Sequence, residues 1–179
     1  SLWSTAANGP PTLEELAKYT WVIWSSGGYE SGGPNLDDLE ALLAHISSGG
    51  RVTISSRRPF FGMDTSDPSV IADVLVDGDI PELVVGLPTD PIVLPNGLPP
   101  VVPLETNFDS DGTLVALRRG ADSGHAGAPL LFIVTDEGEE NTTGARLMIL
   151  GMSLTWFPNE YDKQLVQNMA AVMLADEMP

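Results

Sequence analysis

Residues 21–55 decide the fold of this chain and read WVIWSSGGYESGGPNLDDLEALLAHISSGGRVTIS. Residues 21–24 are apolar at both alternating positions, which predicts a strand covered on both faces, as a central parallel strand is. Between Asn35, an N-cap candidate, and the stop at Gly49-Gly50, leucine and isoleucine recur at helical spacing. Residues 51–55 predict a second strand. Strand, helix and strand within about thirty residues are typical of a right-handed crossover unit with parallel strands.

The segments on either side of this unit carry weaker signals. Thr12 and Glu15 fit a capping box, which predicts a short helix running to about Lys18. Residues 59–103 are rich in proline and glycine and are interpreted as a long irregular insertion. Within it, the pattern predicts a short helix at 68–75 and extended pieces near 83–85 and 92–94.

The last third of the chain predicts three strands and a closing helix. The strands are expected at residues 113–117, 130–134 and 146–150, and the helix is expected to follow the cap candidate Asn159. With the central unit, this pattern predicts a single α/β domain over residues 1–179. Its expected fold is flavodoxin-like, with an open, mostly parallel sheet in three layers and helices on both faces.

Composition restricts the classes of function. The chain has 8 Lys+Arg against 25 Asp+Glu, a net charge of −17, so its field repels polyanions and a role in nucleic-acid binding is not expected. The absence of cysteine excludes disulfides and thiol chemistry. No apolar run approaches the ~20 residues that cross a bilayer, so no membrane partner is expected. Strong acidity often accompanies extracellular or salt-exposed life, although the same surface would serve a cytosolic protein equally well.

Four stretches of the chain carry a resemblance to a known family: residues 19–27, 39–50, 51–56 and 145–154. They resemble the glutamine-amidotransferase-like domains of secreted bacterial peptidases of the subtilisin and immune-inhibitor-A kinds. The resemblance implies a flavodoxin-like fold and a non-catalytic accessory or binding role beside a peptidase, with other domains of the same parent chain as partners. It also implies a secreted protein, of which this chain is a fragment whose export signal lies upstream.

One departure from the family concerns the centre of the sheet. Family members usually open with a further strand and helix that supply the sheet centre, and neither appears before Leu2. Unpaired strand edges are costly, at about 1 to 3 kcal/mol for each buried unpaired group. Three alternatives remain open: another segment fills the vacancy, a partner chain fills it, or this chain is cut within the domain. Strand pairing between copies would give a homo-oligomer.

No catalytic site is expected, because catalytic relatives carry a cysteine in a tight elbow and the corresponding turn here is 55–59, with arginines where small residues are needed. The alternative is a hydrolase in which Ser55 or Ser56 works with His125 and an acid such as Asp136. The other histidine, His45, lies in the predicted helix and is interpreted as a packing or surface residue.

Two further groups are candidate ligand sites. Arg57 and Arg58 follow the end of a predicted strand, where open α/β sheets bind ligands, and could hold a carboxylate or phosphate; salt bridges to surplus acids are the alternative. Asn107, Asp109 and Asp111 place oxygen donors at alternate positions, as at the start of a calcium loop. Arg118 stands where the closing glutamate should be, so the alternative is a plain turn without any cofactor.

Overall fold

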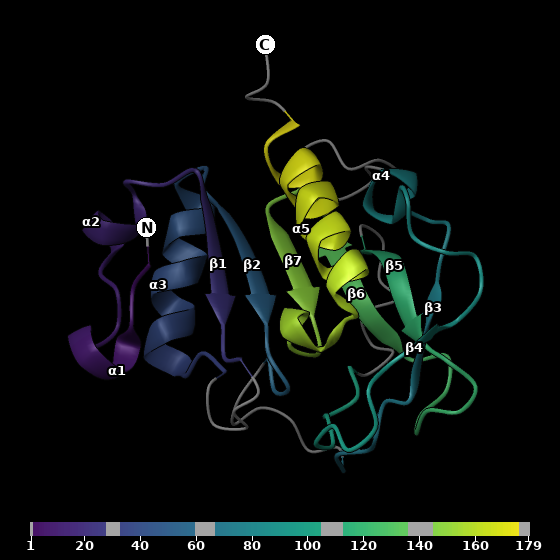
Figure 1. Cartoon of the computed structure of the whole chain (residues 1–179). Helices are drawn as coiled ribbons and strands as arrows, with labels where there is room; N and C mark the ends of the chain where they lie inside the picture. The colour runs from purple at the N-terminus through teal and green to yellow at the C-terminus, as the bar shows by residue number, and fades with distance from the viewer. Residues whose placement is uncertain (1, 28–32, 60–66, 105–112, 136–144, 176–179) are drawn as a thin grey trace.

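The strands form one continuous mixed sheet in the order β1-β2-β7-β6-β5-β3-β4 (Figure 1). The structure is a computed structural model that describes residues 2–27, 33–59, 67–104, 113–135 and 145–175. The elements in chain order are α1 (Thr5–Asn8), α2 (Leu13–Leu16), β1 (Trp21–Ser25), α3 (Leu36–Ser47), β2 (Arg51–Ser55), β3 (Asp73–Val76), α4 (Pro81–Val84), β4 (Ile92–Val93), β5 (Thr113–Arg119), β6 (Pro129–Val134), β7 (Leu147–Leu150), the 3₁₀ helix η3 (Leu154–Trp156) and α5 (Asn159–Met173).

Only one end of the sheet is parallel. β1 pairs with β2 and β2 with β7 in parallel, whereas β7–β6, β6–β5, β5–β3 and β3–β4 are antiparallel. The α/β class and the predicted β1–α3–β2 crossover unit are therefore confirmed, but the flavodoxin-like, mostly parallel arrangement is wrong. A parallel crossover needs about a dozen or more residues and usually a helix, and residues 120–128 between β5 and β6 are a shorter link that makes a hairpin.

The predicted positions of two segments are also corrected. Residues 21–24 form the edge strand β1, not a central strand, and their side chains are half-buried or exposed. Residues 59–103 supply β3, α4 and β4, so they belong to the sheet and are not an insertion outside it. Residues 68–75 hold an isolated bridge at Ser69 and the start of β3 where a helix was predicted. Residues 83–84 lie in α4, and Val85 is its C-cap, where an extended piece was predicted.

The helices begin where local chemistry satisfies their first amides. In α3 the Asn35 side chain accepts from the Asp38 N–H at 3.0 Å, and Asp38 Oδ2 accepts from the Asn35 N–H at 3.0 Å. Thr12 accepts from the Glu15 N–H at 3.3 Å and so caps α2. α5 differs from the prediction, because Pro158 is its N-cap and Asn159 is already helical. None of the helices in the described part is both long and apolar enough to span a bilayer.

Helices cover the two faces of the sheet at different ends. α3 packs on one face, where Leu42 contacts the β2 residues Val52 and Ile54. α5 lies across the other face, over β7 and β6, with Met169 in the main core beside Met148 (Figure 1). Over β1 and β2, the face on the α5 side has no helix of its own among the described residues.

The sheet has no vacancy at its centre. β2 pairs directly with β7 over Val52–Leu147 to Ser55–Leu150, so no further strand is needed between them. Unpaired strand edges within the described part lie at the outer sides of β1 and β4.

Candidate functional site

The two candidate serine nucleophiles are buried structural groups. The Ser55 hydroxyl donates to the Met152 carbonyl at 2.9 Å and accepts from the Leu154 N–H at 3.2 Å, which fixes the turn after β7. Ser56 Oγ accepts from the Ser26 hydroxyl at 3.1 Å and from the Arg58 N–H at 3.1 Å. Both hydroxyls therefore bond to backbone or to another serine, and neither contacts a general base among the described residues.

His125 lies elsewhere in the molecule. It is exposed on the turn between β5 and β6, with a positive φ of 57°. His125 lies just before β6, and the two serines lie at the end of β2. Because β7 lies between β6 and β2, these two strands are two strand spacings, about 10 Å, apart. The structure thus does not bring His125 to Ser55 or Ser56, and the proposed acid Asp136 lies outside the described residues.

The candidate ligand arginines make contacts within the protein. Arg57 donates from Nε to the Pro100 carbonyl at 2.9 Å and also from Nη2 to the same oxygen, which ties the end of β2 to residue 100. Arg58 is half-buried and its N–H caps the turn through Ser56. These contacts give both residues a role in holding the chain after β2.

The calcium candidates Asn107, Asp109 and Asp111 lie outside the described residues. Among the residues that the structure does describe, no group of three His, Asp or Glu side chains is arranged to hold a metal ion.

Burial lowers the pKa of two basic side chains, His45 and Arg119. Burial lowers the pKa of His45, whose Nε2 has no hydrogen-bond partner in the described part of the chain, below its ordinary 6.5. Burial also lowers the pKa of Arg119 to about 10. The Arg119 guanidinium is 1% exposed and donates to Ser69 Oγ at 2.7 Å, the Gly124 carbonyl at 3.0 Å and the Val101 carbonyl at 3.2 Å. Arg119 therefore holds three loops together.

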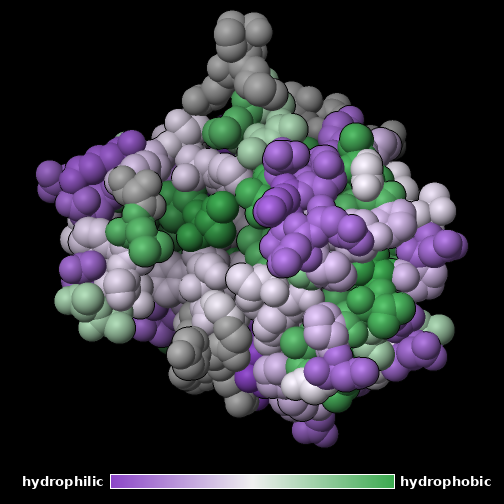
Figure 2. Space-filling view, viewed as in Figure 1, coloured by the Kyte–Doolittle hydropathy of each residue, from purple (hydrophilic) through white to green (hydrophobic). Residues whose placement is uncertain are grey.

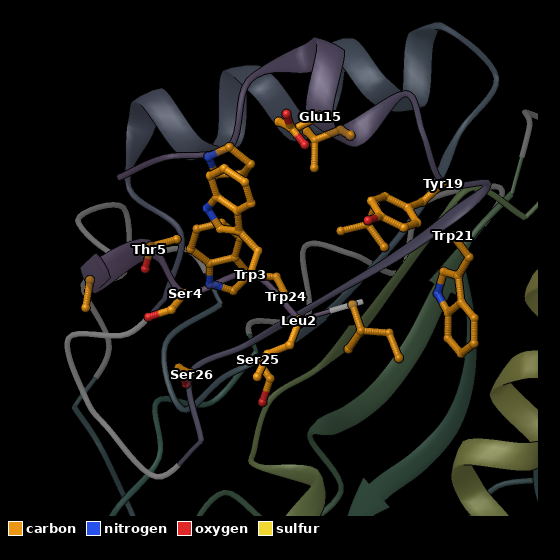
Figure 3. A pocket seen from close by; sticks show the side chains of 15 residues that line it. Leu2, Trp3, Ser4, Thr5, Glu15, Tyr19, Trp21, Trp24, Ser25 and Ser26 are labelled. Atoms are coloured by element: carbon orange, nitrogen blue, oxygen red, sulfur yellow. The ribbon is translucent and has the colours of Figure 1, made fainter. Parts of the chain in front are cut away.

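The feature that fits a binding site is an open cleft along the outer side of β1, which we call the edge cleft. It has a volume of about 780 Å³ and lies between β1 and the N-terminal segment. Figure 2 shows a recessed apolar area over β1, and Figure 3 shows the side chains that line it. Its walls are residues 2–6 and 21–26 together with Pro11, Glu15, Leu16 and Tyr19.

Aromatic and aliphatic side chains dominate the edge cleft. Trp3, Tyr19 and Ile23 are 43%, 41% and 41% exposed, which is unusual for side chains of this size. Trp21 points towards α5 (Figure 3), and its Nε1 donates to Thr53 Oγ1 at 2.9 Å. Glu15 is the acidic residue of the lining, and it pairs with Lys18 at 2.7 Å.

The clustering of tryptophans near the N-terminus is a sequence signal for this cleft that the sequence-based predictions did not use. Three of the four tryptophans fall within the first 24 residues, at positions 3, 21 and 24. Aromatic side chains are enriched where proteins bind others, so their clustering pointed to this end of the chain.

No family model matches this chain, and none of the curated proteins matches it. Among solved structures it is similar to the mmIFT52 N-terminal domain, with a TM-score of 0.58 and 15% identity, over 94% of this chain and 83% of that one. At this identity, the similarity establishes a shared mixed α/β fold.

Proposed function

We propose that this chain is a non-catalytic binding module whose binding site is the edge cleft. The observation that carries the proposal is the exposure of large apolar side chains in one concave site of about 780 Å³, within the range of about 300–1,000 Å³ typical of ligand pockets. The serine hydroxyls that an enzyme would use are engaged in structural hydrogen bonds.

The proposal includes the context that the family resemblance implies. In that context the module is an accessory domain of a secreted bacterial peptidase and places a substrate or partner for it. Fold and resemblance alone do not determine function. The accessory role therefore requires that the edge cleft bind a substrate or partner. A peptidase domain encoded in the same reading frame is the expected finding; its absence would remove the accessory role and leave the binding site untouched.

A peptide selection tests the binding site. Random short peptides displayed on phage are selected on the folded chain, and their affinities are measured by tryptophan fluorescence. Ile23→Asn replaces an apolar side chain of the cleft with a neutral polar one, and Val93→Asn is the matched control, because Val93 is 73% exposed on the opposite edge strand.

Peptides that bind the wild-type chain and Val93→Asn, but bind Ile23→Asn about tenfold more weakly or worse, would support the proposal. If no peptide is enriched, or if both variants bind equally well, the edge cleft is not the binding site.

A further inference from the structure

We infer that the edge cleft receives an extended peptide, which adds to the sheet as a new strand beside β1 and carries basic side chains. This inference rests on the proposed function and names the partner of the same site.

The first observation is the direction of the backbone groups of β1. The Thr20 carbonyl accepts from the Arg51 N–H at 2.8 Å, and the Ser26 N–H donates to the Ser55 carbonyl at 3.1 Å. Even-numbered residues of this strand therefore bond to β2. The backbone groups of successive residues in a strand point to its two opposite edges. The N–H and C=O groups of Trp21, Ile23 and Ser25 therefore point away from β2, towards the cleft. No backbone hydrogen bond within the described part of the chain reaches these groups.

The second observation is that β1 lacks the usual protection of an edge strand. Proteins block edges with prolines, charges, bulges, very short strands or a covering loop. The N-terminal segment lies across the edge cleft from β1, and within the described part of the chain it makes no backbone hydrogen bond to this strand. β4, at the other end of the sheet, is two residues long, follows Pro91 and is succeeded within two residues by Pro95. β1 is five residues long and carries neither proline nor charge. The sheet is thus closed to strand addition at one end and open at the other.

The third observation is the shape of the edge cleft. A paired strand would lie about 4.8 Å from β1, and its side chains would point alternately to the two faces of the sheet. On the α5 side they would meet Ile23, and on the α3 side they would meet Trp24, whose side chain packs with the α3 core. Peptide recognition by strand addition takes its affinity from main-chain bonds and its specificity from such alternate contacts.

The negative charge of the chain favours a basic peptide as the added strand. The net charge is −17, so a second copy of the chain would bring an equal negative charge to the same edge. The one basic residue between Leu2 and Ser26 is Lys18, and it is already paired with Glu15. A peptide with Lys or Arg beside alternating apolar residues is attracted by this field, whereas an acidic one is repelled.

The test uses the peptides selected on the intact chain. When such a peptide is bound, amide hydrogen exchange of Ile23 and Ser25, followed by NMR, should slow by about tenfold or more, because their N–H groups gain partners. N-methylation of alternate peptide residues should weaken binding by about tenfold in one register and leave it nearly unchanged in the other. The enriched peptides should carry a positive net charge.

The outcomes separate the two proposals. Peptides that bind in a manner sensitive to Ile23→Asn, but without amide protection and without an N-methylation register, would overturn strand addition and leave the binding module intact. Failure of any peptide to bind would overturn both. A dimer in solution that Ile23→Asn converts to a monomer would instead identify a second copy as the occupant and overturn the inference of a basic peptide.

Discussion

His45 shows how one buried side chain makes the stability of this protein depend on pH. The ring is 3% exposed in the last turn of α3, and burial lowers its pKa in the folded state. The cost of charging this ring is the cost of desolvating an imidazolium.

We expect the protein to lose stability on mild acidification because of His45. Between the lowered folded pKa and the unfolded value of about 6.5, the unfolded chain binds more protons. The free energy of unfolding therefore rises with pH through this window. The contribution is complete above about pH 6.5 and is lost as the pH falls towards the folded pKa. Urea unfolding of wild type and His45→Leu across this range measures it.

The variant His45→Leu should show a smaller slope in this window. As a control, His125→Asn changes the other histidine, which is exposed on its turn with a positive φ that Asn tolerates. An equal slope in wild type and His45→Leu would contradict the prediction.

The same ring explains the glycine at position 50. A Cβ placed on Gly50 would lie 2.2 Å from His45 Cε1 and Nε2. Gly50→Ala should therefore destabilise the protein by about 1–3 kcal/mol, the usual cost of overpacking. In the His45→Ala background the same substitution should cost much less, and a double-mutant cycle by urea unfolding measures the difference.

Gly78→Ala is the matched control for this cycle, because a Cβ there would meet no atom within 4 Å. It should be neutral or slightly stabilising. If Gly50→Ala costs as much without the His45 ring as with it, the explanation fails.

Among the secondary-structure elements, α3 depends most clearly on its first residues. Asn35→Ala removes the side-chain acceptor of the capping box and should lower the free energy of unfolding by about 1 kcal/mol. Asp37→Ala, in the same turn but outside the capping box, should lower the free energy of unfolding by less. Thermal or urea unfolding of both variants checks the order, and an equal loss would show that first-turn charge matters more than the cap.

The elements divide sharply into those that local sequence predicts and those that it does not. α3 and β2 were predicted to within a residue or so, because Asn35, Gly49-Gly50 and the apolar stripe are local signals. The directions of β5 and β6 were not predicted, since apolar strands such as residues 130–134 look alike in parallel and antiparallel sheets. Most of β3 was predicted as part of a helix at 68–75. The length of the link at 120–128 was the available clue.

The candidate site was less predictable than the fold. Its polar candidates came from the ends of strands, where Ser55, Ser56 and Arg57 turned out to hold neighbouring loops. The edge cleft arises because the N-terminal segment stands beside β1, which is a tertiary arrangement that no local pattern encodes. Once β1 is known to be an edge, the exposed aromatic residues near it become meaningful.

The whole molecule has an uneven distribution of buried apolar contacts. The buried cluster under α3 contains Leu16, Leu42, Val52 and Ile54, whereas a much larger cluster joins α4 and α5 to β3, β5, β6 and β7. Regions with fewer buried contacts open at lower free energy.

We therefore expect local opening of the N-terminal part before global unfolding. In native-state hydrogen exchange, amides of β1 and α3 should exchange with lower opening free energies than those of β6, β7 and α5. β2, which contributes Val52 and Ile54 to the cluster under α3 and pairs with β7, should be intermediate. Identical opening free energies throughout would show that the chain unfolds as one cooperative unit.

The contrast between the two ends of the sheet also fixes the stoichiometry of any complex made by strand pairing. A fibre grows only if every subunit offers two compatible sides, one to receive and one to donate. Here the short, proline-flanked β4 offers no such side, so docking at β1 ends the series after a single event. If a strand adds to β1 as inferred above, the product is a discrete one-to-one complex, and β1 can be exposed without the hazard of polymerisation.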